Sequence, residues 1–167
     1  MRPNIDLVIE AGDWPEEDTL STWFEAAIGA ATSATDFNLA LGEISVVLTD
    51  DPAMQTINWE HRGKDKPTNV LSFPALASDA LAELNGKRPF LLGDLVFALQ
   101  TIEREAEAGQ ISLHAHMSHL IVHGFLHLLG YDHEEDLQAE AMEALETRIL
   151  ATLDIADPYR GGAMTTV

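Results

Sequence analysis

Short apolar segments rich in β-branched residues alternate along this chain with longer segments whose apolar residues recur at helical spacing. The short segments are typical of strands, and the last of them is apolar on both faces, which indicates a central position in a sheet. The predicted strands cover residues 5–9, 44–48, 70–73 and 91–99.

Helices are predicted where apolar residues recur every three to four positions. One of them starts with Asp51 as its N-cap and Pro52 in the first helical position. The helices are expected at about residues 15–31, 51–59, 103–108, 112–129 and 134–153. This order predicts an α+β (α/β-like) fold, in which one small mixed sheet is packed by helices.

Composition indicates one globular domain. The chain has 167 residues, of which 46% are hydrophobic and 22% charged, and these values are ordinary for a single folded domain. We expect the domain to span residues 1–156 and residues 157–167 to form a frayed tail. The absence of cysteine excludes disulfides, a thiol nucleophile and a cysteine-ligated metal.

Acidic residues dominate the charge, with 28 Asp and Glu against nine Lys and Arg and a formal net charge of −19. The chain therefore lacks the overall basic surface of a typical nucleic-acid binder. Its N-terminal region is acidic and its longest apolar stretch contains histidines, so we expect neither a signal peptide nor a membrane span, and a soluble cytoplasmic protein.

The histidines supply the candidate chemistry, since six of the seven lie between positions 114 and 133. His123 and His127 are four residues apart on a predicted helix, so they share a face and can bind one ion. Gly130 can end this helix in a left-handed conformation, and the chain can then return His133 to the same ion. Three imidazoles with an open fourth position describe a catalytic zinc site, where the pKa of a bound water falls toward ~7.

Neighbouring polar residues have alternative interpretations. His119 precedes His123 by one turn and is either a substrate contact or a packed neighbour, whereas His114 and His116 are expected to be solvated or structural. Asp132 is a turn residue, an outer partner of the metal ligands or a group that orients water.

The spacing His-x3-His-x2-Gly-x2-His also matches the extended motif of metzincin proteases. That motif requires a glutamate after the first histidine as general base. Gly124 stands there and cannot accept a proton, which disfavours a protease; a peptide digest would decide.

A basic segment at residues 62–69 is the second candidate. The planar guanidinium of Arg62 suits phosphate oxygens, and Lys64 and Lys66 add mobile charge, so all three are candidate substrate contacts. Charged runs of this kind are usually solvated loops. On an acidic chain with a metal site, however, this one indicates where a phosphate backbone is held.

Two long motifs and a short one between them occur in order along the chain. They are Asn58-x3-Arg62-Gly63-Lys64-Asp65-Lys66-Pro67-Thr68-Asn69-Val70-Leu71-Ser72-Phe73-Pro74, then Leu92-Gly93-Asp94, then the segment from His119 to His133. Over about residues 40–153 the chain resembles the YbeY family of bacterial metal-dependent endoribonucleases. The resemblance implies one zinc ion on the three histidines, a functional Arg62 and a single-stranded RNA substrate. It also implies a role in rRNA maturation at the 3′ end of small-subunit RNA and in ribosome quality control.

Asn69 departs from the family pattern, because members often carry aspartate there. If that carboxylate has a chemical role, this protein is altered; if it only caps a turn, asparagine serves as well. The loop at residues 77–88 is specific to this chain.

The expected function is thus that of a zinc-dependent endoribonuclease in which Arg62 stabilises charge on the phosphate. Water and the RNA 2′-hydroxyl are alternative nucleophiles, which a 2′-deoxy substitution at the scissile position would separate. Nickel and copper also bind such sites. The main alternative is a non-catalytic ribosome-assembly factor with a structural metal, which a fourth ligand from Asp132 or His119 would favour. Basic ribosomal proteins are candidate partners.

Overall fold

The structure, a computed structural model, describes residues 2–84 and 86–159. Within these residues the chain alternates between strands and helices, as the sequence pattern predicts. The elements are β1 (Asn4–Ile9), α1 (Glu17–Ser33), β2 (Gly42–Thr49), α2 (Asp51–Arg62), β3 (Val70–Pro74), α3 (Ser78–Ala82), β4 (Phe90–Ala98), α4 (Leu99–Ala108), α5 (Leu113–Leu128) and α6 (Asp136–Thr152).

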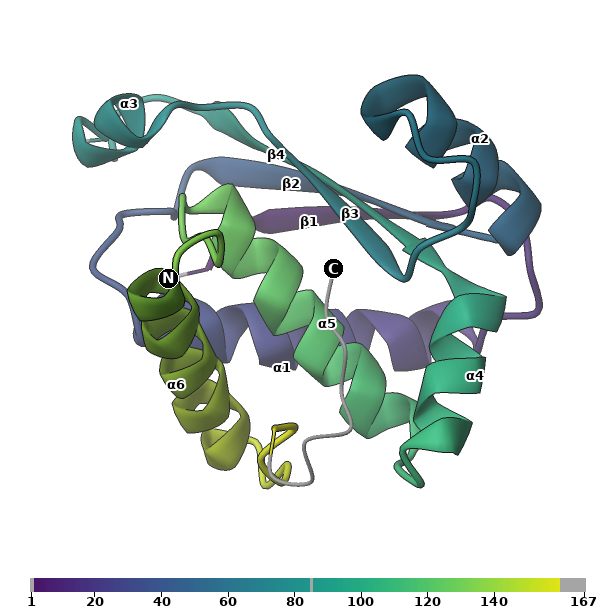
Figure 1. Cartoon of the computed structure of the whole chain (residues 1–167). Helices are drawn as coiled ribbons and strands as arrows, with labels where there is room; N and C mark the ends of the chain where they lie inside the picture. The colour runs from purple at the N-terminus through teal and green to yellow at the C-terminus, as the bar shows by residue number, and fades with distance from the viewer. Residues whose placement is uncertain (1, 85, 160–167) are drawn as a thin grey trace.

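The strands form one mixed sheet in the order β1-β2-β4-β3. β1 pairs with β2 and β2 with β4 in parallel, whereas β3 runs antiparallel to β4 at the edge. Helices α1, α4, α5 and α6 lie on one side of the sheet and α2 on the other (Figure 1). The predicted α+β fold and the central position of the last strand are confirmed.

Alternate side chains of the strands enter two hydrophobic layers, because successive residues of a strand point to opposite faces. The larger layer lies between the sheet and the helices α1 and α5, and it includes Leu95 and Phe97 of β4. The smaller layer lies under α2, where Met54 packs with Leu71 and Val96. Both faces of β4 are therefore covered, which explains its nearly continuous apolar sequence.

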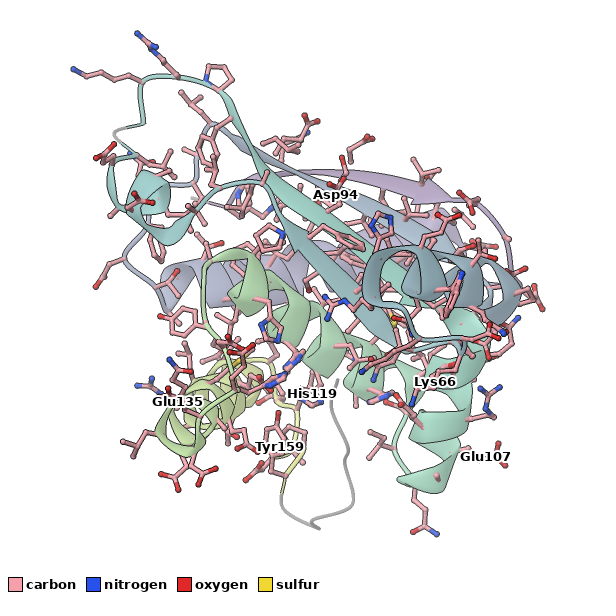
Figure 2. All side chains as sticks on the ribbon, turned by 45° about the horizontal axis from the view of Figure 1, so that its top comes forward. Lys66, Asp94, Glu107, His119, Glu135 and Tyr159 are labelled. Carbon is pink, nitrogen blue, oxygen red and sulfur yellow. The ribbon has the colours of Figure 1, made fainter. Side chains whose placement is uncertain are left out.

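Helix α5 is buried along most of its length because it packs against the sheet, α1, α4 and α6. Gly124 permits the close approach to the sheet: a Cβ there would lie 3.0 Å from Leu95 Cδ2 and 3.3 Å from Ser72 Oγ. The opposite face of α5 is turned toward α6 and the C-terminal segment, where His119 lies beside Tyr159 (Figure 2).

Two predicted helix starts were wrong. The N-cap of α2 is Asp50, whose carboxylate accepts a backbone N–H of the first turn, and not Asp51. Helix α4 begins at Leu99, directly after β4, and not at residue 103. Asp51 explains the early start, since its Oδ1 accepts the backbone N–H and the hydroxyl of Thr101, at 3.0 and 2.8 Å. The first turn of α4 is thus capped by a residue of α2.

The remaining irregular segments differ in part from the prediction. The segment expected as a loop at residues 77–88 contains the short helix α3. Within the predicted tail, the described residues 157–159 place the Tyr159 side chain against α6, and residues 160–167 lie outside the described part of the chain. In that part, no helix is long and apolar enough to cross a membrane.

Candidate metal centre

Three histidines converge at the end of α5. His123 and His127 lie one turn apart on this helix, and their Nε2 atoms are 3.1 Å apart. His133, in the segment after α5, joins them: one ring nitrogen of each residue lies within 4.8 Å of the others. The structure therefore brings together the three residues that the sequence spacing singles out.

The turn after α5 positions His133. Gly130 has a φ of +96°, a conformation that glycine adopts at little cost, and its N–H donates to the carbonyl of His127 at 3.0 Å. The carboxylate of Asp132 accepts the backbone N–H of His133 at 2.7 Å. This bond fits the first alternative interpretation of Asp132, that of a turn residue.

Hydrogen bonds determine which nitrogen of two rings can bind a metal. The Nδ1 of His127 lies 2.9 Å from the carbonyl oxygen of Tyr131, and the Nδ1 of His123 lies 2.9 Å from Glu146 Oε2. Carbonyl and carboxylate oxygens only accept hydrogen bonds, so both Nδ1 atoms donate. In the neutral rings the Nε2 lone pairs then face each other, an arrangement that a cation between them relieves. The donor set fits a metal ion such as zinc.

Burial favours the neutral, ligand-competent form of this cluster. Desolvation, together with the neighbouring His123, lowers the pKa of His127 to about 4. The imidazole therefore need not lose a proton to bind a metal at neutral pH.

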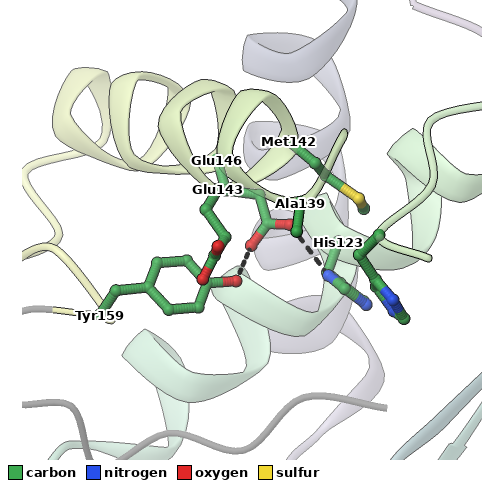
Figure 3. A pocket seen from close by; sticks show the side chains of 7 residues that line it. His123, Ala139, Met142, Glu143, Glu146 and Tyr159 are labelled. Carbon is green, nitrogen blue, oxygen red and sulfur yellow. Dashed lines mark hydrogen bonds and ion pairs between the residues drawn. The ribbon is translucent and has the colours of Figure 1, made fainter. Parts of the chain in front are cut away.

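A buried carboxylate lies behind the cluster. Glu146 of α6 has no solvent exposure and meets three donors: His119 Nε2 at 2.8 Å, His123 Nδ1 at 2.9 Å and the Tyr159 hydroxyl at 2.5 Å. Figure 3 shows the contacts with His123 and Tyr159. Burial alone would raise the pKa of Glu146, but the hydrogen bonds from His119 and His123 outweigh it and lower this pKa to about 2. Glu146 is thus a charged carboxylate inside the protein.

Sequence reasoning missed Glu146 and Tyr159. Glu146 carries one signal, because it falls on the apolar stripe of the last predicted helix, beside Met142 and Ile149, where a charge needs a partner. Tyr159 lies in the predicted tail and carries no such signal. A cavity of about 200 Å³ adjoins both residues and is lined by His123, His133, Ala139, Met142, Glu143, Glu146 and Tyr159.

The other histidines of α5 lie outside the cluster of three. His119 is 1% exposed and bound to Glu146, a placement that fits the packed-neighbour alternative. Although His119, His123 and Glu146 also form a compact donor set, hydrogen bonds among them account for their approach. His116 is fully buried with its Nε2 2.8 Å from Glu105, and His114 is exposed.

Asn69 uses both ends of its amide. Its Oδ1 accepts the backbone N–H of Val70 at 2.7 Å, and its Nδ2 donates to Glu105 Oε1 at 3.0 Å. Glu105 also binds His116 of α5. The amide therefore ties the start of β3 to α4 and α5, and an aspartate could not donate the second bond.

We expect Asn69→Asp to destabilise the protein by about 1–3 kcal/mol, because it replaces a bond to a charged group by two facing carboxylates. The free energy of unfolding in urea measures this. Glu105→Gln in the same background should restore most of the loss, since glutamine can donate to the new carboxylate. Equal stability of Asn69→Asp and the wild type would contradict this account.

The basic segment at residues 62–69 forms a loop at the C-terminal end of α2. Gly63 ends α2 with a φ of +68°, and the buried Asn58 donates to the carbonyl of Lys66 at 2.8 Å, so the loop has a defined path. Arg62, Lys64 and Lys66 are exposed. Among the described residues, no hydrogen bond or ion pair joins these cations to the histidine cluster. The structure therefore leaves them available to a ligand but does not bring them into contact with the metal ligands.

Three imidazoles converge in this α+β domain, and hydrogen-bond acceptors outside the cluster orient two of them. This arrangement is typical of metal-dependent enzymes. Residues 9–154 match the family model described as endoribonuclease YbeY. The chain is 49% identical over 165 residues to the endoribonuclease YbeY of Rhizobium etli, covering 95% of this chain and 94% of that protein. It is 48% identical over 163 residues to the one of Sinorhizobium medicae, covering 93% and 94%. The chain belongs to the endoribonuclease YbeY family, and the prediction of a metal-dependent enzyme of this family is confirmed.

The fold has a solved counterpart. The solution structure of TM1509 from Thermotoga maritima superposes with a TM-score of 0.55 at 22% identity, covering 93% of this chain and 98% of that one. At this identity the likeness concerns the fold alone.

Proposed function

We propose that this protein is a zinc-dependent endoribonuclease that cleaves single-stranded RNA, with a role in rRNA maturation at the 3′ end of small-subunit RNA and in ribosome quality control. The observation that carries the proposal is the convergence of His123, His127 and His133, with the Nδ1 hydrogens of the first two already engaged. Family membership supplies the reaction class.

Each residue of the proposed site has one task. The three histidines bind zinc, which when present supplies Lewis acidity and lowers the pKa of a bound water. Arg62 holds the phosphate and stabilises the charge that develops on it, while Lys64 and Lys66 contact the backbone on either side.

A purely structural metal is the competing function. Structural zinc sites are usually closed by four protein ligands. His119 and Asp132, the two candidates for a fourth ligand, are engaged with Glu146 and with the backbone of the turn. Their engagement supports three protein ligands and an open position, which favours catalysis.

The direct test is cleavage of a labelled transcript that spans the 3′ end of small-subunit precursor RNA, beside an unrelated single strand and a duplex. We expect the purified protein to cut the single-stranded RNAs, to lose activity with a chelator and to regain it with zinc. Bound zinc without any cleavage would instead support the assembly-factor alternative.

Arg62→Ala should reduce cleavage by about 10²–10³-fold, the usual cost of removing one donor to a developing oxyanion. Metal content should not change, since Arg62 lies outside the histidine cluster. Arg148→Ala is the matched control, because Arg148 is an exposed arginine on α6. Cleavage by Arg62→Ala at the rate of the control would exclude the proposed role.

A further inference from the structure

Burying the carboxylate of Glu146 costs free energy, which its hydrogen bonds must offset. An isolated buried carboxylate loses its hydration, and well-packed apolar side chains often stabilise a core at least as well. Glu146 nevertheless lies among Met142, Leu145 and Ile149 on the buried stripe of α6. A contact with the histidine cluster explains its position: Glu146 Oε2 lies 2.9 Å from the Nδ1 of His123, the ring nitrogen that faces away from His127.

Both oxygens of this carboxylate accept hydrogen bonds, each from a different side. Oε1 meets two donors, His119 Nε2 and the Tyr159 hydroxyl, and Oε2 meets His123 Nδ1. Because a carboxylate only accepts, it selects the tautomer of His123 that carries hydrogen on Nδ1. The Nε2 lone pair of His123 is then directed toward His127, where a metal would bind.

Tyr159 extends this arrangement beyond the family match, which ends at residue 154. The chain returns along α6 after its last turn, and the tyrosine ring packs edge-on against His119 at a centroid distance of 5.4 Å. Figure 3 shows the hydroxyl directed at Glu146 from the side opposite His123.

We propose that Glu146 is a positioning residue that fixes the metal-binding tautomer of His123, and that Tyr159, from the segment beyond the family match, holds Glu146 in place. The inference rests on the metal site of the proposed function. It assigns to the C-terminal segment a part in metal binding that the histidine motif alone does not include.

Glu146→Gln tests the proposal sharply because glutamine keeps the size of the side chain. The amide has one accepting oxygen and one donating NH2 group, so it cannot satisfy donors on both sides. The oxygen is expected to take the side with two donors, His119 and Tyr159, and the NH2 group then faces His123. His123 would have to present a lone pair at Nδ1 and move its hydrogen to Nε2, where it blocks the metal.

The measurements need no RNA. Nitrogen-15 NMR of the metal-free protein reports which nitrogen of His123 carries hydrogen, and competition with a chromogenic chelator gives the zinc affinity. We expect the tautomer to invert in Glu146→Gln and zinc affinity to fall by about 10–100-fold. Tyr159→Phe, which removes one hydrogen bond, should lower affinity by about 3–10-fold and keep the tautomer. Glu143→Gln is the control, because Glu143 lines the same cavity without a described bond to a histidine, and it should bind zinc like the wild type.

An unchanged tautomer and zinc affinity in folded Glu146→Gln would overturn the proposal. If that variant does not fold, Tyr159→Phe decides, and wild-type zinc affinity there would overturn it. A wild-type protein that binds zinc but cuts no RNA would refute the endoribonuclease function while these measurements still test the positioning role.

Discussion

His127→Ala should release the metal and lower RNA cleavage by more than ~100-fold, because loss of an outer partner alone commonly costs ~10–100-fold and this change removes a direct ligand. Two imidazoles would remain, and zinc sites of catalytic type use three. The Nε2 of His127 also lies 3.1 Å from the Nε2 of His123. The variant therefore removes one of the two closely spaced Nε2 ligands that α5 supplies.

Metal content and cleavage must be measured on the same samples. His114→Ala is the matched control, since His114 belongs to the same helix but is exposed and outside the cluster. We expect the control to keep both properties and His127→Ala to lose both, with circular dichroism showing that each is folded. Cleavage that survives in His127→Ala would point to a contaminating nuclease, and bound metal that survives would place the ion elsewhere.

The part of this site that could be predicted is local in sequence. Two histidines four apart and a glycine at the helix end determine positions within about three turns, and helix geometry is the same wherever the helix packs. His123 and His127 consequently lie where the spacing places them, and Gly130 has the expected left-handed conformation.

The parts that could not be predicted depend on contacts between distant segments. Glu146 meets His123 across 23 positions of sequence, and Asp51 caps the first turn of α4 across 50. The periodicity of the sequence does not reveal the partner in either contact, because each partner depends on how α6 and α2 pack against other elements. The start of α4 escapes prediction for this reason, since its N-terminus has no cap from its own segment.

Gly124 has one meaning in the sequence motif and another in the packing of α5. In the motif, it stands where a protease has its glutamate general base, and glycine cannot act as a base. In the structure it faces Leu95 and Ser72 of the sheet, so a glutamate there would enter the core rather than the histidine cluster. The absence of the acid and the packing of α5 are therefore consequences of the same orientation of the helix, which the spacing alone does not reveal.

Gly93→Ala is expected to destabilise the protein by about 2–5 kcal/mol, through backbone strain and a steric clash together. Gly93 lies in β4 with a φ of +155°, which side-chain-bearing residues rarely adopt. A Cβ would lie 2.5 Å from the carbonyl oxygen of Phe73 and 2.7 Å from Leu128 Cδ2. The carbonyl belongs to the paired strand β3 and cannot retreat without breaking the ladder.

Urea unfolding measures this loss, and Gly63→Ala separates its two causes. Gly63 has a φ of +68°, but a Cβ added there would meet no atom within 4 Å, so this variant carries only the backbone cost, about 1–2 kcal/mol. Because Leu128 follows His127 directly, the clash in Gly93→Ala should also displace the end of α5 and weaken zinc binding, whereas Gly63→Ala should leave zinc affinity unchanged. Equal losses of stability in the two variants would show that the contact with β3 and α5 contributes nothing.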